Sequence, residues 1–381
     1  MILFWYGLGA TLFWIVTSIY LQVNRAKVGY LAYGDAHPLS PEPSLAVIIA
    51  VRNEEEQLRQ ALQSVCQLHY GPYRILVVND RSTDRTAEIL AEFAHQYPFV
   101  TVLTIETLPP GWLGKNNALY QGYLEATEEW LLFTDADVAF APDALRKAMQ
   151  YAARHQLDHL TLMPEIISRS GWLLGMLASF KIMLELKLRP WALRNPRSGA
   201  SMGVGAFNLI RRQAYAQAGT HRPIALRPDD DLKLGELIKK AGLKQDVLYG
   251  DGEVALEWYA GVGEFVKGLM KNTFATSDYK LSVAIGTALA TLLAFALPLP
   301  LLLGLGDAPE KAMALVILLC LLPLFISSKG PDGKWWYALL QPFAGWLLVY
   351  IILKSALLTL RQGGIYWRES FYPLSDLKKN V

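Results

Sequence analysis

The amino-acid sequence predicts an α/β protein with an open, mostly parallel sheet that apolar helices at both ends of the chain attach to a membrane. Between residues 44 and 280, short aliphatic runs alternate with stretches of helical periodicity, which is the pattern of βαβ units. Apolar residues cluster outside that region. Of all 381 residues, 52% are hydrophobic and 18% are charged, whereas soluble domains carry roughly 25% charged residues. We therefore expect a membrane-attached protein.

The first expected strand, residues 45–51, is a continuous aliphatic run typical of a parallel strand buried on both faces. The same patterns place further strands at 74–78, 100–105, 130–134 and 160–163, with helices at 54–66, 83–93, 116–125 and 142–155. Because ligands of open α/β sheets bind beyond the carboxyl ends of the strands, the residues that follow each strand are the candidates for a site.

The N-terminal segment predicts an uncleaved membrane anchor. Residues 1–21 contain no charge, and at about 1.5 Å per residue they can cross a hydrocarbon core of roughly 30 Å. Arg25 and Lys27 follow directly, so the positive-inside rule places the next domain in the cytoplasm, at the inner membrane of the cell. A proline-rich linker then leads to residue 44.

Three apolar segments follow the domain, at 283–305, 312–327 and 335–360, and prolines at 298 and 300 interrupt the first. Three crossings would put the C-terminal tail outside, yet its basic residues, and the basic loop before the last segment, favour the cytoplasm: Lys329, Lys334, Arg361, Arg368, Lys378 and Lys379. We therefore expect 335–360, which contains Pro342 and Lys354, to be re-entrant or interfacial. The expected divisions are 1–23 anchor, 24–43 linker, 44–280 cytoplasmic catalytic domain, 281–360 membrane segments and 361–381 cytoplasmic tail.

Charge and cysteine content exclude other classes. The net charge is +2 and no basic block occurs, so no nucleic acid is expected as a partner. Cys66 and Cys320 are too few and too far apart in sequence for a disulfide framework or a CxxC metal site.

Asp135 and Asp137 follow the strand at 130–134. Alternate residues of an extended chain point the same way, so both carboxylates can share one Mg²⁺ or Mn²⁺ ion. An exposed turn or a cap of the next helix would also use such residues, but the polar clusters after the other strands lie on the same rim of the sheet and favour the metal site.

Two further rim residues suit a nucleotide diphosphate. Asp80, after the second strand, can accept a hydrogen bond from the imide of uracil, although it can also cap the helix that follows. Lys115 stands just before a helix, where a cation and free backbone amides together suit a diphosphate.

Three consecutive acids, Asp229, Asp230 and Asp231, open a helix. They could complement the helix dipole, but three carboxylates exceed what a cap needs, and one of them suits a general base for an acceptor hydroxyl. The glycine-containing stretch 199–205 supplies a loop through which an acceptor could enter.

Residues 171–195 combine apolar side chains with flanking tryptophans and basic ends, which is typical of a helix that lies in the bilayer interface. Residues 257–276 have the same character. Beside the acid cluster, these helices would let a membrane-dissolved hydroxyl reach the base, which predicts a lipid acceptor and the bilayer itself as partners.

The motifs at 50–54, 78–84, 135–137 and 230–234 resemble, in this order, those of family 2 glycosyltransferases, which have the GT-A fold and invert the anomeric centre. The elements at 111–115 and 363–368 resemble a narrower bacterial membrane group that includes carotenoid (hydroxychlorobactene-type) glucosyltransferases and hopanoid-associated glycosyltransferases. The resemblance implies these roles: Ala50, Arg52, Glu54, Asp80, Lys115 and Asp135 in nucleotide-sugar binding, Asp137 with Asp135 on the metal, and Asp231 or Asp230 as the catalytic base.

Two departures from the family pattern matter. Asn79 replaces the first acid of an Asp-Asp pair, and Asp230 replaces a glutamate, which leaves the register of the base open between Asp230 and Asp231. The Gln-x-x-Arg-Trp motif of processive synthases is missing, so the resemblance implies transfer of one sugar, expected to be glucose from a UDP-sugar, to a lipid or terpenoid hydroxyl. A polyprenyl-phosphate sugar transferase is the serious alternative. A non-enzymatic scaffold would not need these clusters.

Overall fold

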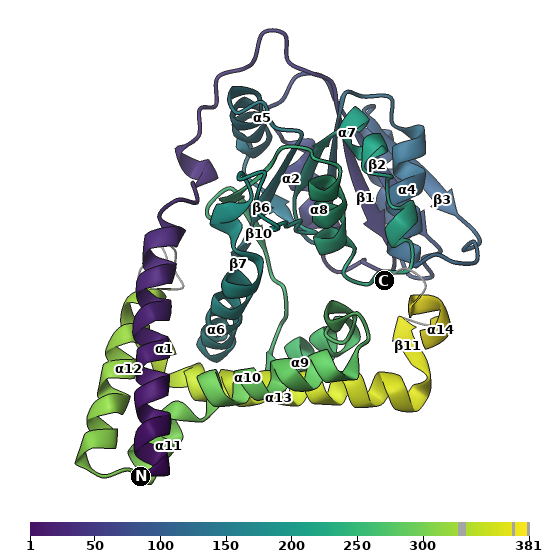
Figure 1. Ribbon diagram of the computed structural model, residues 1–381. Coiled ribbons are helices and arrows are strands. Elements are labelled where there is room, and N and C mark those ends of the chain that lie inside the picture. Colours follow the sequence, from purple (N-terminus) through teal and green to yellow (C-terminus); the bar gives the residue numbers. More distant parts are fainter. Residues whose placement is uncertain (327–332, 368–369, 379–381) are drawn as a thin grey trace.

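The fold was determined as a computed structural model, which describes residues 1–326, 333–367 and 370–378 and confirms the α/β architecture (Figure 1). Its central sheet has seven strands in the order β3-β2-β1-β4-β8-β6-β9. Neighbouring strands are parallel except β8, which runs antiparallel to both β4 and β6. The strands are β1 (Leu45–Val51), β2 (Tyr73–Asp80), β3 (Val100–Ile105), β4 (Trp130–Thr134), β6 (His159–Met163), β8 (Asn208–Arg211) and β9 (Gln245–Tyr249).

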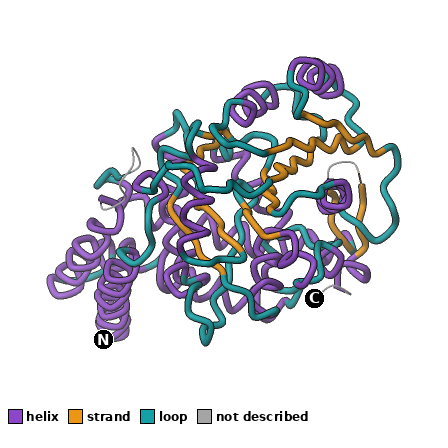
Figure 2. Tube along the Cα trace, turned by 90° about the horizontal axis from the view of Figure 1, so that it is seen from above, coloured by secondary structure: helices purple, strands orange, loops and turns teal. Residues whose placement is uncertain are grey.

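Helices cover both faces of this sheet, as Figure 2 shows. Burial of both faces of β1 explains why its sequence is apolar throughout. Val47 and Ile49 pack into one hydrophobic core, and Ala46 and Ile48 pack into the other. The first core includes side chains of α2 (Leu58–Cys66), α3 (Thr86–Gln96) and α5 (Ala144–Arg154). The second includes side chains of α4 (Gly114–Glu125), α7 (Arg212–Gln217) and α8 (Asp230–Lys240).

Most element boundaries agree with the predicted ones, but helix α2 begins at Leu58 and not at Glu54. The residues in between are held by the loop that follows β2. The amide of Glu54 donates to Thr86 Oγ1 at 2.9 Å, and that of Glu55 donates to Asp84 Oδ2 at 3.2 Å. These bonds between loops keep the segment out of the helix and fix the rim of the sheet.

A second sheet of three short strands was not predicted, because its strands are too short to show a periodicity. It consists of β5 (Ala139–Phe140), β10 (Val254–Leu256) and β7 (Glu165–Ile166). Below it lie the two helices expected at the bilayer interface, α6 (Gly171–Leu188) and α9 (Val262–Asn272) (Figure 1). Helix α6 packs along α13 (Tyr337–Gln362) and so connects the domain to the apolar helices.

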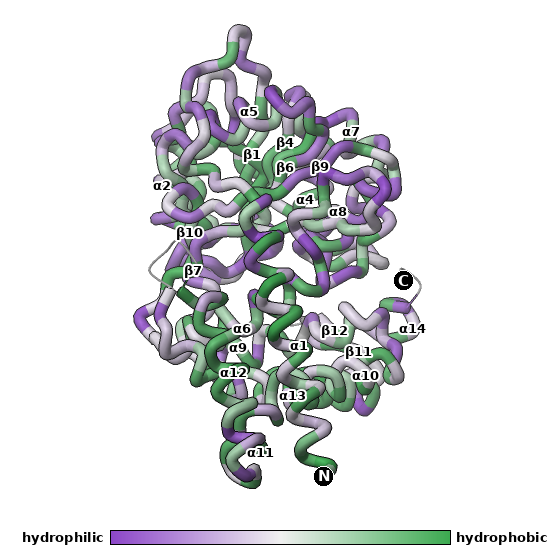
Figure 3. Tube along the Cα trace, turned by 60° about the vertical axis from the view of Figure 1, so that its left-hand side comes forward, coloured by the Kyte–Doolittle hydropathy of each residue, from purple (hydrophilic) through white to green (hydrophobic). Residues whose placement is uncertain are grey.

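Within the part of the chain that the structure describes, three helices are long and apolar enough to cross a membrane: α1 (Ile2–Arg25), α12 (Ala308–Ile326) and α13. A bent pair could form a fourth span. It joins α10 (Leu281–Thr291) and the π-helical turn η5 (Leu292–Ala296) to α11 (Pro298–Gly304) at 45°, so the predicted interruption at Pro298 is confirmed. Figure 3 shows these lower helices as predominantly hydrophobic and the upper domain as more hydrophilic.

Helix α13 is unbroken although it contains Pro342 and Lys354. Its length and composition suit a span, yet it runs crosswise to α1 and α12 beneath the domain (Figure 1). An interfacial or re-entrant course for 335–360 therefore stays a prediction. After α13 come β11 (Gly364–Trp367), β12 (Ser370–Pro373) and α14 (Leu374–Leu377). The basic residues Lys329, Arg368 and Lys379 lie outside the described residues.

Short 3-10 turns complete the chain as described, at Leu31–Tyr33, Pro190–Ala192, Arg222–Ile224 and Ala275–Ser277.

Candidate active site

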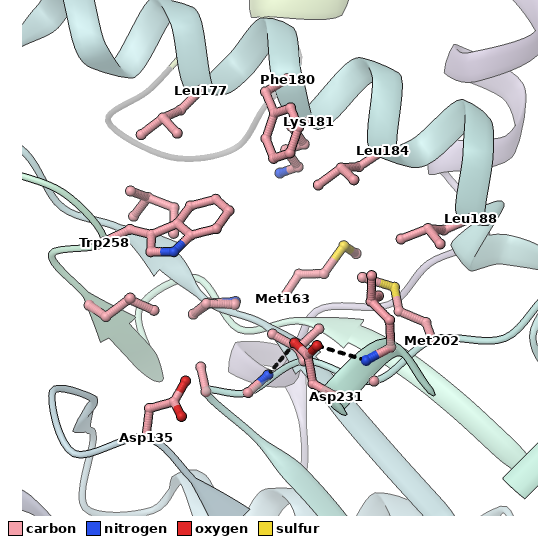
Figure 4. Close-up of a pocket in the computed structure, with 18 of the residues that line it drawn as sticks. Asp135, Met163, Leu177, Phe180, Lys181, Leu184, Leu188, Met202, Asp231 and Trp258 are labelled. Atoms are coloured by element: carbon pink, nitrogen blue, oxygen red, sulfur yellow. Dashed lines mark hydrogen bonds between the residues drawn. The ribbon is translucent and has the colours of Figure 1, made fainter. Parts of the chain in front are cut away.

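One cavity of about 1200 Å³ lies beyond the carboxyl ends of β1, β2 and β4. It has two parts, which we call the acid floor and the apolar arm. The acid floor contains all the predicted site residues except Asp230: Ala50, Arg52, Glu54, Asp80, Lys115, Asp135, Asp137 and Asp231. The apolar arm is lined by side chains of α6 and α9 and by Met163, Met202 and Trp258 (Figure 4). Residues far apart in sequence thus share one space.

Lys115 is the cation at the centre of the acid floor. Its Nζ atom lies 2.6 Å from Asp135 Oδ1 and 3.9 Å from Asp230 Oδ1. Burial alone would lower the pKa of Lys115, but the carboxylates of Asp135, Asp230 and Asp231 raise that pKa above its usual value. The lysine is therefore charged at the first turn of α4, where free backbone amides favour an anion.

Asp137 is a floor carboxylate whose negative charge is poorly compensated by its surroundings. Burial, followed by the nearby charge of Asp135, raises the pKa of Asp137 to about 6. Such a group gains from a cation. Within the described residues no three His, Cys, Asp or Glu side chains gather to hold a metal, so an ion here would take one or two protein carboxylates, as Mg²⁺ does where substrate phosphates and water complete its shell. The donor set fits that use.

The three consecutive acids have separate environments. Asp229 is neutralised by the fully buried Arg227, whose Nε and Nη2 atoms donate to its two oxygens at 2.8 Å. Asp230 lies behind the floor, beside His221 and Leu234 in a small secondary cavity, where burial raises its pKa to about 7. Asp231 alone of the last two lines the main cavity.

Backbone amides hold Asp231 in place (Figure 4). Gly205 N donates to its Oδ2 atom at 2.9 Å, and Leu232 N donates to its Oδ1 atom at 2.7 Å. Burial, with a smaller effect from the charge of Asp135, raises the pKa of Asp231, although Lys115 and the two amide hydrogen bonds act in the opposite direction. A fixed carboxylate of raised basicity that faces the cavity has the properties of a general base.

The glycine stretch 199–205 packs tightly into the site. A Cβ atom on Gly205 would lie 2.5 Å from Asp135 Oδ2, and one on Gly203 would lie 2.1 Å from the carbonyl oxygen of Asp231. Glycine at these two positions lets the backbone pass between the acids. The stretch therefore positions the floor, beyond the role in acceptor entry expected from the sequence.

Asp80, expected at the base of the nucleotide, lies at the end of β2. Both of its oxygens accept hydrogen bonds from Arg81, at 2.8 and 2.9 Å, and Arg52 Nη1 lies 3.8 Å away. Its Oδ2 atom also packs against Gly114, where a Cβ atom would come within 2.2 Å. The role of Asp80 in binding uracil stays a prediction. Arg81 occupies both oxygens of the Asp80 carboxylate and therefore lies at the same end of β2.

Sequence reasoning missed four residues around the cavity. Lys181 and Tyr249 line the apolar arm, Tyr372 from β12 lines the same cavity, and Arg227 neutralises Asp229. Lys181 had a signal, because it interrupts the apolar stripe of its helix. Tyr249 and Tyr372 owe their places to contacts between distant elements, which no local pattern encodes. Arg227 stands only two residues before Asp229, but a sequence pattern does not show which of the three acids it binds.

Comparison with known proteins defines the class. Residues 46–219 match Glycosyl transferase family 2, so the chain carries a family 2 glycosyltransferase domain. Two curated relatives are 4,4'-diaponeurosporenoate glycosyltransferases. The one from Staphylococcus haemolyticus is 28% identical over 67% of this chain and 67% of its own length. The one from Staphylococcus aureus strain USA300 is 28% identical over 57% of this chain, and the chain spans only 56% of that relative's length.

The fold also matches a solved structure, that of a mannosyltransferase from Pyrobaculum calidifontis in complex with GDP-Man and Mn²⁺. The TM-score is 0.61 at 16% identity, over 97% of this chain and all of that one. This likeness confirms the GT-A fold, including the helices outside the central domain.

Proposed function

We propose that this protein is an inverting, non-processive glycosyltransferase that moves one sugar, glucose, from a UDP-sugar to a hydroxyl of a membrane lipid such as a carotenoid or another terpenoid. The observation that carries the proposal is the single cavity: its acid floor suits a nucleotide-sugar, and its apolar arm opens from that floor toward the ends of α1 and α12. A donor and a lipid can therefore meet beside Asp231 without an exit to water.

On the donor side, Asp135 and Asp137 would hold a Mg²⁺ or Mn²⁺ ion, and a solved protein of the same fold was obtained with Mn²⁺. When bound, such an ion neutralises the charge that develops on the leaving diphosphate. Lys115 and the first turn of α4 provide a second positive region for the same phosphates. Ala50, Arg52, Glu54 and Asp80 line the region for the nucleoside and sugar.

Asp231 would act as the base. It accepts the proton of the acceptor hydroxyl while that oxygen attacks the anomeric carbon and the bond to the diphosphate breaks. This single displacement inverts the anomeric centre. The two amides fix the Asp231 carboxylate, so attack is confined to one direction. Asp230, whose Oδ1 atom lies 3.9 Å from Lys115 Nζ, would help to keep Lys115 protonated.

The apolar arm would hold the acceptor. Leu177, Leu184 and Trp258 give it walls that suit a terpenoid chain. The curated relatives are named for 4,4'-diaponeurosporenoate, a carotenoid, which supports a carotenoid or similar lipid as acceptor. With α1 and α12 as spans, the domain would lie on the cytoplasmic face of the inner membrane, because Arg25 and Lys27 follow α1.

The test uses the full chain purified in detergent with UDP-[¹⁴C]glucose and a total bacterial lipid extract. We expect label in the organic phase with Mn²⁺ or Mg²⁺, a loss of at least about 100-fold with EDTA, and recovery when metal is restored. Slow hydrolysis of UDP-glucose without lipid should show the same metal dependence. The absence of both transfer and hydrolysis would refute the proposal.

Mass spectrometry of the labelled lipid decides the acceptor. A terpenoid carrying one hexose supports the proposal, whereas a polyprenyl-phosphate hexose would replace it with the alternative acceptor. A product with several hexoses would refute single transfer.

A further inference from the structure

The chain returns to the acid floor after helix α13. This helix is followed by Gly363, whose φ of +68° suits a glycine and turns the chain out of the helix. Strands β11 and β12, which we call the C-terminal hairpin, then pair in antiparallel register with Ile365 opposite Tyr372. The hairpin and α14 lie between the end of α13 and the upper domain (Figure 1).

Apolar packing fixes the C-terminal hairpin in place. Ile365 of β11 and Leu377 of α14 are buried in one hydrophobic cluster. Phe274, and Ile352 from α13, belong to the same cluster. Tyr372 packs against this cluster and also lines the main cavity. The place of Tyr372 at the cavity is therefore set by a packed core.

Tyr372 lies at the part of the acid floor that is expected to hold the nucleoside. It lines the cavity together with Arg52, after β1, and Asp80, at the end of β2. Burial has the largest effect on the pKa of Tyr372, which it raises, and a hydrogen bond with Ser370 opposes it. The charges of Arg81, Asp80 and Arg52 also act on this pKa. Because such effects weaken with distance, the hydroxyl of Tyr372 lies near these charges.

A nucleobase in this region needs contacts both at its edge and on its flat face. Asp80 can accept a hydrogen bond only at the edge of a base, and Arg81 already donates to both of its oxygens at 2.8 and 2.9 Å. The face of a base packs best on an aromatic ring. Tyr372 brings such a ring, and a hydroxyl that suits the ribose, to the same end of the cavity.

We propose that Tyr372 binds the nucleoside of the donor, so that the C-terminal hairpin completes the nucleotide site. This inference rests on the proposed function, because it assigns a further residue to the donor side of that reaction. The nucleotide would lie between the rim of the central sheet and the hairpin. The segment after α13 would thus serve the donor and not the lipid.

The test measures nucleotide binding. Full-length protein in detergent with Mg²⁺ is titrated with UDP and with inorganic pyrophosphate by calorimetry. Tyr372→Ala should weaken the binding of UDP at least about tenfold, the scale of a lost contact between a base and an aromatic ring. Pyrophosphate, which has no nucleoside, should bind this variant as it binds the wild type. In Tyr372→Phe, wild-type affinity for UDP would assign the contact to the ring, and a loss equal to that of Tyr372→Ala would assign it to the hydroxyl.

Phe371→Ala is the matched control. Phe371 is the neighbour of Tyr372 on β12, is 42% exposed and does not line the cavity. Its ring packs on Tyr366 with 5.0 Å between the ring centroids. The affinity of Phe371→Ala for UDP should equal that of the wild type. A loss as large as that of Tyr372→Ala would show that the fold of the hairpin is responsible and would overturn the inference.

Unchanged UDP affinity in Tyr372→Ala would also overturn the inference, as would an equal loss of affinity for pyrophosphate. The same holds if UDP binds the wild type no more tightly than pyrophosphate does. Hydrolysis of UDP-glucose by the wild type, measured on the same samples, judges the proposed function separately. Its absence, together with weakened UDP binding in Tyr372→Ala, would refute the proposed reaction and leave the nucleoside contact standing.

Discussion

The two parts of the cavity are built in different ways. The acid floor is assembled from the end of β1 with the loop after it, the end of β2, the loop after β4, the start of α4 and the start of α8, so its residues come from five places in the chain. The apolar arm is dominated by one face of a single helix, α6. Changes in the floor should therefore alter the chemistry through small displacements of charge, whereas changes in the arm should alter which lipid binds and leave the chemistry intact.

The largest effect is expected for Asp231→Asn. Loss of the base should lower transfer about 10³-fold, within the range typical of general base catalysis, because asparagine cannot accept the proton. Binding of UDP, followed by calorimetry, should be unchanged. Asp230→Asn is the matched control, since Asp230 lies behind the floor. Greater damage from Asp230→Asn than from Asp231→Asn would move the base by one residue.

A second prediction concerns the backbone of the floor. The new methyl of Gly205→Ala would lie 2.5 Å from Asp135 Oδ2 and force the acid aside. Overpacking of this kind typically lowers stability by about 1–3 kcal/mol. Because the displaced Asp135 would no longer align with the donor, we expect transfer to fall roughly 10- to 100-fold. Gly199→Ala, where a Cβ atom meets nothing within 4 Å, should retain near-normal rates in the same radiochemical assay. Equal losses in both variants would mean that the loop and not the acid contact is responsible.

The arm should respond differently. Leu184→Trp narrows the arm and should raise the KM for the lipid about tenfold, the usual scale for a change of size in an apolar pocket. Hydrolysis of UDP-glucose without acceptor should stay at the wild-type rate. The same substitution at the exposed Lys187 serves as control. A parallel loss of hydrolysis in Leu184→Trp would show that floor and arm are not separable.

The smallest effect concerns how the free energy of unfolding depends on pH through His221, which lines the small secondary cavity behind the acid floor. Burial, followed by the charge of Lys115, lowers the pKa of His221 to about 3, against about 6.5 in an unfolded chain. The unfolded state therefore takes up a proton first as the pH falls. The stabilising contribution is complete above pH 6.5 and is lost on acidification, by up to about 1.4 kcal/mol per pH unit.

His221→Gln should flatten the decline of the unfolding temperature between pH 6.5 and 5, measured in detergent by scanning fluorimetry. The exposed His95→Gln should leave the wild-type slope unchanged. A wild-type slope in His221→Gln would exclude this histidine as its source. The buried His159, whose pKa burial lowers to about 4, contributes in the same direction, so some slope should remain.

The sequence was informative where local patterns carry the structure. The aliphatic run of β1 predicted a strand with two buried faces, and the prolines at 298 and 300 predicted a bend. The acidic motifs predicted the rim of the sheet at which the cavity lies, because parallel strands bring their carboxyl ends to one edge.

What could not be predicted depends on contacts across the fold. The three acids of α8 look equivalent in sequence, and only the position of Arg227 and of the glycine loop separates their environments. The ion pair between Lys115 and Asp135 links the first turn of α4 to the loop after β4, twenty positions further along the chain. The strands of the short sheet β5-β10-β7 have only two or three residues each, which is too short for a strand pattern to show in the sequence.

The bond between Arg25 and Glu185 makes the anchor part of the interior of the molecule. Glu185 is 98% shielded from solvent, and its counter-ion is the last residue of helix α1. A shortened protein that starts at Ser44, made to obtain a water-soluble domain, would leave the buried Glu185 carboxylate without its Arg25 partner. Loss of one member of a buried ion pair typically lowers stability by about 3–5 kcal/mol. Removal of the anchor would therefore disturb the wall of the cavity that Arg25 and Glu185 form. The full chain in detergent keeps that wall intact.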